Sequence, residues 1–230
     1  MMWFRVLSLA SVLLGLGLAS PAVAEERHAG LARLIDGDTI EIDDQRIRLN
    51  GIDTPEPAQR CTGSNGKSYR CGKRATDALN QLIRGRPVVC VGSTRDGYDR
   101  LIAECSVDDG SAGTLSLNRE MVRLGWAVAF EKFTDVYLPE QLEAAKEARG
   151  IWRGPFQLPH EFRAERWKIT QQKSPDGCPI KGNINAKGVR IYHTPWSQYY
   201  PRTRIDLSKG ERWFCDEAQA IKAGWRAPYR

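Results

Sequence analysis

Alternating apolar and polar residues mark two short segments in the first quarter of the chain, residues 40–42 and 46–49. A period of two is typical of a strand with one buried face, and the two aspartates at 43–44 suit a tight turn between the segments. Two further β-rich runs, residues 87–91 and 101–107, flank a loop rich in Gly, Asp and Tyr. These segments predict a set of strands in the first half of the chain.

Apolar residues at helical spacing mark three other segments, residues 72–83, 117–124 and 138–148. The second and third are followed closely by Gly125 and Gly150, and helices commonly stop at glycine. The order of elements is that of a five-stranded OB barrel with about three helices packed on it. We therefore expect an α+β fold built on an OB-fold barrel, followed by a small α+β module at the C-terminus.

The first 24 residues have the pattern of a secretory signal. Arg5 precedes an apolar run over residues 6–18, and residues 22–24, Ala-Val-Ala, provide the small side chains of a cleavage site. The run is shorter than the roughly 20 residues of a membrane helix, and no later stretch is long enough to span a bilayer. We expect cleavage and a secreted or periplasmic monomer; an uncleaved N-terminal anchor is the alternative.

Export places the six cysteines in a compartment that permits disulfides. Six cysteines allow fifteen sets of disulfide pairings, and the spacing of the cysteines along the chain reduces this choice. Cys61–Cys71 would close a local loop, Cys90–Cys105 would join two β-rich runs, and Cys178–Cys215 is the pair that remains. Zinc is the competing interpretation, which we disfavour because the chain has no C-x-x-C motif and only three histidines.

Length and composition restrict the class of protein. A chain of 230 residues with 41% hydrophobic and 27% charged residues is neither disordered, collagen-like, coiled-coil nor a multi-span membrane protein. The length suits one core domain with a smaller appendage. We expect a core domain over residues 25–157, a polar linker over 158–176 that can contain a helical turn around 161–168, and a disulfide-bonded module over 177–230.

Positive charge is concentrated in the last part of the chain. Residues 158–230 contain 14 Lys and Arg against 7 Asp and Glu, whereas residues 25–157 contain 19 against 21. Half of the chain's Phe, Trp and Tyr residues also lie in the basic part. A basic and aromatic surface can hold single-stranded nucleic acid by charge and by stacking.

Acidic and basic side chains with potential chemistry lie in three short stretches, residues 36–39, 48–56 and 95–100. Asp38, Asp53 and the carbonyl of Thr54 are oxygen ligands of the kind that Ca²⁺ prefers. Two arginines, Arg48 and Arg100, could donate to the oxygens of a phosphodiester during its cleavage. Glu56 would then be free to accept a proton from water.

These stretches carry a family resemblance. The residues that carry it are Asp36-Gly37-Asp38-Thr39, Arg48-x4-Asp53-Thr54-Pro55-Glu56, Tyr98-x-Arg100, Leu117-Asn118 to Gly125, and Gly150-Ile151-Trp152. Together, over roughly residues 30–152, they resemble the staphylococcal nuclease (thermonuclease) family. The resemblance implies an OB-fold, Ca²⁺-dependent endonuclease that acts on DNA and RNA, cuts at the 5′ oxygen and leaves 3′-phosphate ends.

The resemblance also assigns roles to residues. It implies metal ligation by Asp38, Asp53 and Thr54, catalysis by Glu56 as general base, catalysis and phosphate binding by Arg48 and Arg100, and nucleotide contact by Tyr98. A cysteine-bracketed insert over residues 57–70, Gly97 in place of a family lysine, and Phe130 near a family tyrosine depart from the pattern. We expect catalysis to persist with altered affinity or substrate preference.

Each residue also has a structural interpretation. The Asp-Gly-Asp sequence is a common turn between strands, and Arg100 could simply pair with Asp96 or Asp99. The rival function is therefore a non-hydrolytic OB-fold protein that binds nucleic acid or an acidic polysaccharide in the cell envelope.

The C-terminal part resembles the small sunset modules that end some exported bacterial proteins, in its cysteines at 178 and 215 and in residues 179–184, 191–193, 210–214 and 223–226. Three roles stay open for it: single-stranded nucleic-acid binding, envelope polysaccharide binding, or packing alone. We expect His193 to be an ordinary packed or exposed residue.

Overall fold

The computed structural model describes residues 24–111, 113–130 and 135–229. The predicted signal therefore lies almost wholly outside the described residues. Within the described part, no helix is both long enough and apolar enough to cross a membrane.

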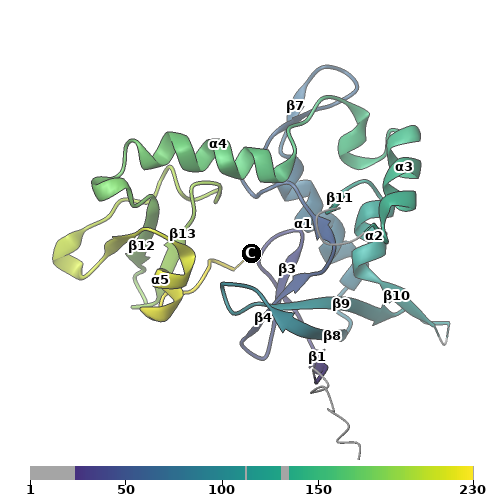
Figure 1. The fold of residues 1–230 in the computed structure, drawn as a ribbon, viewed down its shortest axis with the longest axis horizontal. Coiled ribbons are helices and arrows are strands. Elements are labelled where there is room, and N and C mark those ends of the chain that lie inside the picture. The colour runs from purple at the N-terminus through teal and green to yellow at the C-terminus, as the bar shows by residue number, and fades with distance from the viewer. Residues whose placement is uncertain (1–23, 112, 131–134, 230) are drawn as a thin grey trace, which may run out of the picture.

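A curled mixed sheet forms the first half of the molecule (Figure 1). Its strands run in the order β1-β8-β9-β4-β3-β2, and β10 adds to β9. Only β4 and β9 pair in parallel; the other pairs are antiparallel. The strands are β1 (Glu26–Gly30), β2 (Arg33–Leu34), β3 (Thr39–Ile42), β4 (Gln45–Leu49), β8 (Val88–Arg95), β9 (Leu101–Asp108) and β10 (Thr114–Ser116). The α+β, OB-type expectation is confirmed, and β1, β2 and β10 are strands outside the four segments that the hydrophobic pattern marked.

The hairpin between β3 and β4 shows why the sequence folds in this way. Asp43 and Asp44 both have positive φ, 47° and 63°. A two-residue turn with two positive φ angles matches the right-handed twist of the strands on either side. The register then places Ile40 opposite Ile47, and both side chains are fully buried in the core.

Three helices cover the sheet, as the spacing predicts: α1 (Cys71–Ile83), α2 (Leu117–Arg123) and α3 (Leu138–Lys146). The apolar face of α1 contributes Ala75 and Leu79 to the core. Two short strand pairs and one helical turn complete this part: β5 (Ile52–Asp53) with β11 (Val128–Ala129), β6 (Cys61–Thr62) with β7 (Ser68–Tyr69), and η1 (Gly150–Arg153).

The predicted linker is instead largely a helix, α4 (Pro159–Gln171), which spans 13 residues. Pro159 at the first helical position has a favourable φ and no amide hydrogen to satisfy. The Glu161 carboxylate accepts a hydrogen bond from the Leu158 amide at 3.3 Å, which satisfies a free donor at the helix start. Figure 1 shows α4 running from the barrel to the C-terminal module.

The C-terminal module, expected over residues 177–230, contains a three-stranded sheet in which β12 (Ile180–Ile184) lies between β13 (Arg190–His193) and β14 (Arg212–Phe214). The helix α5 (Glu217–Lys222) follows, and the turns η2 (Pro175–Gly177) and η3 (Leu207–Lys209) are 3₁₀ helices. His193 is buried, and its Nε2 lies 2.9 Å from Asn183 Oδ1, as expected of a packed histidine.

The C-terminal module packs directly on the barrel. Ile35 of the barrel belongs to the apolar core of the module, which includes Tyr192 and Trp225. Polar contacts add to this: the Tyr192 hydroxyl accepts from Arg46 Nη1 at 2.8 Å, and the Tyr229 hydroxyl donates to Glu41 at 2.8 Å. The barrel and the C-terminal module therefore form a common interface with both apolar and polar contacts.

The structure contains the three predicted disulfides, Cys61–Cys71, Cys90–Cys105 and Cys178–Cys215. Cys90 lies directly opposite Cys105 in the β8–β9 ladder. None of the three links the barrel to the C-terminal module, so the two parts are held together by packing and by the chain itself.

Candidate active site

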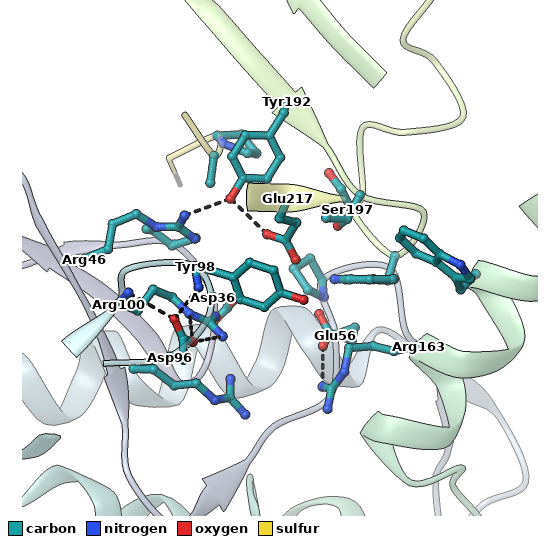
Figure 2. Close-up of a pocket in the computed structure, with 18 of the residues that line it drawn as sticks. Asp36, Arg46, Glu56, Asp96, Tyr98, Arg100, Arg163, Tyr192, Ser197 and Glu217 are labelled. Atoms are coloured by element: carbon teal, nitrogen blue, oxygen red, sulfur yellow. Dashed lines mark hydrogen bonds and ion pairs between the residues drawn. The ribbon is translucent and has the colours of Figure 1, made fainter. Parts of the chain in front are cut away.

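A cleft of about 530 Å³ lies between the barrel and the C-terminal module (Figure 2). The barrel provides Arg48, Glu56 and Arg100 to its lining, and α4 provides Arg163. The opposite wall comes from the C-terminal module, in particular Tyr192. The cleft therefore collects several predicted site residues together with groups that are distant from them in sequence.

Asp38 lies in the turn before β3 and is almost fully buried. Its Oδ2 accepts hydrogen bonds from the Thr54 amide at 2.9 Å and from the Thr54 hydroxyl at 3.1 Å. Gly37 permits this contact, because a Cβ at that position would lie 2.7 Å from the Thr54 hydroxyl oxygen. The Asp-Gly-Asp sequence therefore holds Asp38 against residue 54.

Asp53 ends the short strand β5 and has no solvent exposure. Arg48 on β4 connects it to Asp38: Arg48 Nη1 donates to Asp38 Oδ1 at 2.6 Å, and Nη2 donates to Asp53 Oδ1 at 3.1 Å. The structure thus brings together the three predicted metal-ligating residues and one of the two predicted phosphate-binding arginines.

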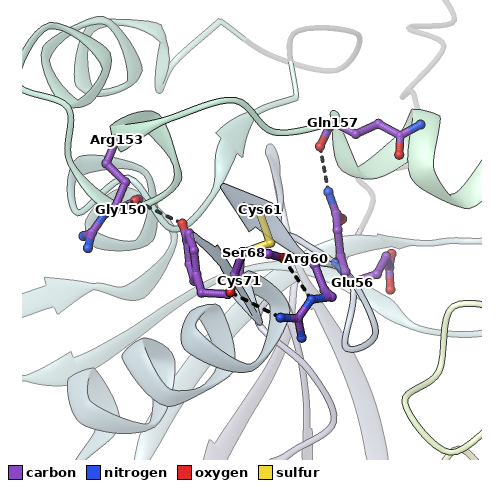
Figure 3. The surroundings of a disulfide bond; sticks show 10 residues. Glu56, Arg60, Cys61, Ser68, Cys71, Gly150, Arg153 and Gln157 are labelled. Atoms are coloured by element: carbon purple, nitrogen blue, oxygen red, sulfur yellow. Dashed lines mark hydrogen bonds between the residues drawn. A yellow bond between two sulfur atoms is a disulfide. The ribbon is translucent and has the colours of Figure 1, made fainter. Parts of the chain in front are cut away.

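Glu56 lies in the loop that follows β5 and is held there by hydrogen bonds. Its amide donates to Gln59 Oε1 at 3.1 Å, and Gln59 Nε2 in turn donates to the Gln157 carbonyl at 2.7 Å. The Cys61–Cys71 disulfide lies beside this segment (Figure 3). The insert over residues 57–70, through Gln59 and the disulfide, therefore helps to hold the loop that carries Glu56 in place.

Arg163 of α4 reaches into this group of carboxylates. It donates to both oxygens of Asp53, from Nη1 at 2.9 Å and from Nη2 at 3.0 Å, and Nη1 also donates to Glu56 Oε1 at 2.6 Å. Figure 2 shows its guanidinium beside Glu56. The sequence pattern did not indicate Arg163, since this residue lies in the predicted linker, more than a hundred residues from its partners.

Burial and neighbouring charge change the acidity of the carboxyls. Burial raises the pKa of Glu56 to about 8, against the opposing charge of Arg163. Burial and the nearby Asp38 raise the pKa of Asp36 to about 6. For Asp38 burial acts in the same direction, but Arg48 and the Thr54 amide outweigh it and lower the pKa. Asp38 is therefore the most firmly ionised of the three.

Arg100 lies in the same cleft, where its charge acts against burial to lower the pKa of Asp36 and Asp38, but it forms its hydrogen bonds with Asp96. Its Nε donates to Asp96 Oδ2 at 2.7 Å, so the alternative pairing with Asp96 is present. The Arg100 guanidinium carbon lies 5.3 Å from the centre of the Tyr98 ring, and the Tyr98 side chain is partly exposed. Phe130 also lines the cleft, 6.4 Å from the His160 ring.

Residues 46–154 match the family model described as staphylococcal nuclease homologue. A relative from Rhizobium meliloti, named succinoglycan biosynthesis protein ExoI, is 35% identical over 171 residues, which are 73% of this chain and 85% of the relative. The chain belongs to the staphylococcal nuclease homologue family. It is therefore a hydrolase of the nuclease class, and the OB-type barrel is the fold of that family.

Two proteins named as endonucleases are also similar to this chain. An uncharacterized endonuclease from Escherichia coli O157:H7 is 34% identical over 145 residues, 60% of this chain and 86% of that protein. A probable endonuclease, LCL3, from Saccharomyces cerevisiae is 31% identical over 126 residues, 51% of this chain and 44% of that protein.

The C-terminal part matches a different family model. Residues 167–227 match the model described as ArfC, and the resemblance to sunset modules is not confirmed. Arg163 lies in the short interval between the nuclease match and the ArfC match.

Proposed function

We propose that this protein is an exported, Ca²⁺-dependent endonuclease that hydrolyses phosphodiester bonds of DNA and RNA and leaves 3′-phosphate ends. The observation that carries the proposal is that Arg48, which lines the cleft together with Glu56, binds the buried carboxylates of Asp38 and Asp53. The similarity to proteins named endonuclease supports the reaction class.

The donor set suits a hard divalent cation. Asp38, Asp53 and the Thr54 carbonyl would hold Ca²⁺ through oxygen atoms, which is the ligand type this ion takes. In the structure the four carboxylate oxygens of the two aspartates already accept hydrogen bonds, several of them from arginines. Bound Ca²⁺ would supply positive charge to a phosphate oxygen and to the attacking water.

The remaining steps belong to side chains of the chain itself. Glu56 accepts the proton of the attacking water at a carboxylate oxygen. Its pKa, raised to about 8, is closer to neutral pH than that of an ordinary glutamate, which suits a group that accepts and releases a proton. Arg48 and Arg100 stabilise negative charge on the phosphate oxygens as it develops. Asp96 orients Arg100 by accepting from its Nε, and it thereby directs the guanidinium within the cleft.

A second cavity, of about 550 Å³, supports a nucleic-acid-binding role for the C-terminal module. Its lining includes Arg202, Arg204 and Arg226 with Tyr199 and Tyr229. Arg202 and Arg226 lie over these two tyrosine rings, and within the described residues none of the three arginines pairs with a carboxylate. Cations beside aromatic rings suit a strand that offers both phosphates and bases.

Export is proposed from the signal-like first 24 residues and is supported by the three disulfides. The rival function is a non-hydrolytic protein that binds nucleic acid or an acidic polysaccharide. The relative named for succinoglycan biosynthesis favours keeping the polysaccharide as a second candidate ligand.

One assay separates the two functions. Purified protein is incubated with DNA and with RNA, with Ca²⁺ or with EGTA, and the product ends are analysed for 3′-phosphate. We expect cleavage with Ca²⁺, none with EGTA, and ends that accept extension only after phosphatase treatment. Retention of substrate without cleavage in either condition would favour the binding protein.

A further inference from the structure

Two arginines from different parts of the chain converge on Asp53. Arg48 donates to Asp53 Oδ1, and Arg163 donates to both Oδ1 and Oδ2. Asp53 is completely buried, so its charge needs compensation from groups in direct contact. The two guanidinium groups together place two positive charges beside this carboxylate, equal to the charge of one divalent cation.

The two arginines are not equivalent. Arg48 lies within the barrel, on β4, and it also binds Asp38. Arg163 lies on α4 and has no position in the barrel, and its side chain keeps 23% of its surface exposed. A change in its rotamer can remove its guanidinium from Asp53 without disturbing a strand.

The place of Arg163 is set by the packing of α4. Gln59 of the barrel holds the Gln157 carbonyl just before this helix, at 2.7 Å. On the other side, Trp167 of α4 lies 6.1 Å from the Trp196 ring of the C-terminal module. The barrel therefore holds the chain just before α4 and the C-terminal module packs against its second half, and the bidentate contact with Asp53 is a property of the docked helix.

We propose that Arg163 occupies the cation position at Asp53 and sets the affinity of the active site for Ca²⁺. This inference rests on the proposed function, because Ca²⁺ is the cation proposed there. A cation that binds Asp53 competes with the Arg163 guanidinium, because Arg163 donates to both oxygens of Asp53. The affinity of the site for Ca²⁺ is accordingly lower than the donor set alone would give.

The test is calcium binding to the calcium-free protein, measured by isothermal titration calorimetry in the absence of nucleic acid. Arg163→Gln should bind Ca²⁺ at least tenfold more tightly than wild type, a difference of about 1.4 kcal/mol. Lys168→Gln is the matched control, because it removes the same charge from an exposed position of the same helix. Its affinity should equal that of wild type.

Unchanged or weaker binding by Arg163→Gln would overturn the proposal, and weaker binding would mean that Arg163 holds the carboxylates in place. An equal gain in Lys168→Gln would overturn it as well, because the effect would then be one of net charge. Arg163→Lys keeps the positive charge but cannot donate to both Asp53 oxygens as the guanidinium does. Its Ca²⁺ affinity should lie nearer to that of wild type than to that of Arg163→Gln. Equal affinities of the Lys and Gln variants would contradict competition by charge.

The proposed function can fail separately. If wild type cleaves DNA only with Ca²⁺ and Arg163→Gln shows no gain in affinity, the nuclease stands and the role of Arg163 falls. If neither protein binds Ca²⁺ and EGTA leaves cleavage unchanged, both the calcium dependence and the role of Arg163 are wrong. Thermal unfolding of each calcium-free variant shows that the proteins compared are folded.

Discussion

Gly72, the second residue of α1, lies directly against the backbone of Glu56. A Cβ built on Gly72 would be 1.7 Å from the Glu56 carbonyl oxygen and 2.5 Å from its carbon. Contacts this short require the backbone to move. The position of the Glu56 carboxylate therefore depends on the absence of a side chain at residue 72.

We expect Gly72→Ala to reduce the cleavage rate at least tenfold, because even a small displacement of a catalytic group is costly. Gly85→Ala is the control: no atom lies within 4 Å of where its Cβ would be, although the φ of +71° makes the substitution mildly unfavourable for folding. The measurement is kcat on a DNA substrate with Ca²⁺, together with the thermal midpoint of each variant. A fully active Gly72→Ala protein would show that the backbone around Glu56 can shift to accommodate the new Cβ without lowering the cleavage rate.

Substitution of Glu56 by Gln should lower kcat by about 10²-fold to 10⁴-fold, the range that general-base catalysis supplies. The change removes the proton acceptor and keeps the shape of the side chain. Binding of an uncleaved oligonucleotide, followed by fluorescence anisotropy, should change little. Wild-type turnover in this variant would sink the assignment of Glu56 as the base.

Arg100→Ala should lower kcat by about 10²-fold to 10³-fold if its guanidinium stabilises the transition state. The Asp96→Asn variant separates the two roles of Arg100, because it weakens the orienting contact and keeps the arginine. It should retain more activity than Arg100→Ala. If Arg100→Ala cleaves at the normal rate, the pairing with Asp96 is structural.

The stability of the C-terminal module should fall as pH decreases below 6.5. Burial, with a smaller effect of Lys181, lowers the pKa of His193 from 6.5 to about 4. Between these pH values the unfolded chain binds a proton that the folded module does not, so acid favours unfolding. The full shift corresponds to about 3 kcal/mol, present above pH 6.5 and lost by pH 4.

The measurement for His193 is urea unfolding at several pH values, followed by tryptophan fluorescence. His193→Gln should show a smaller loss of unfolding free energy than wild type between pH 6.5 and pH 4. Equal pH dependence of the two proteins would mean that the carboxyl groups of the chain account for the acid sensitivity.

The arginines of the second cavity should contribute to nucleic-acid affinity. Each phosphate contact contributes about 0.7 to 0.9 to the slope of log affinity against log salt. The double substitution Arg202→Ala and Arg204→Ala should therefore lower affinity for a single-stranded oligonucleotide and reduce the slope by up to about 1.8. The pair Lys187→Ala and Lys222→Ala removes the same charge from exposed positions of the module and should leave the slope nearly unchanged. If both pairs of substitutions reduced the slope equally, the salt dependence would come from the net charge of the module. The second cavity would then not be the nucleic-acid-binding site.

Local patterns predicted the barrel well because its elements follow from residues close together in sequence. The alternation around Ile40 and Ile47 and the helical spacing of Ala75 and Leu79 both place the side chains that the core needs. The strand β1 was missed because its sequence, Glu-Arg-His-Ala-Gly, has no alternation of apolar and polar residues.

The part of the candidate site that is formed by residues close together in sequence could also be predicted. Asp38, Arg48 and Asp53 lie within 16 positions of one another, and their spacing is a recognisable pattern. The contact of Arg163 with Asp53 spans 110 positions and depends on where α4 docks. No local pattern marks Arg163 among the other cations of this helix, so only the three-dimensional structure assigns it to the site.

Ile35 is a barrel residue by its place in the chain and a residue of the C-terminal core by its packing. A fragment that ends after Gln157 would expose this side chain to water and would also remove Arg163 from the buried charge of Asp53. The nuclease match alone therefore does not delimit a self-sufficient unit. The electrostatics of the cleft therefore depend on an arginine that neither matched segment includes.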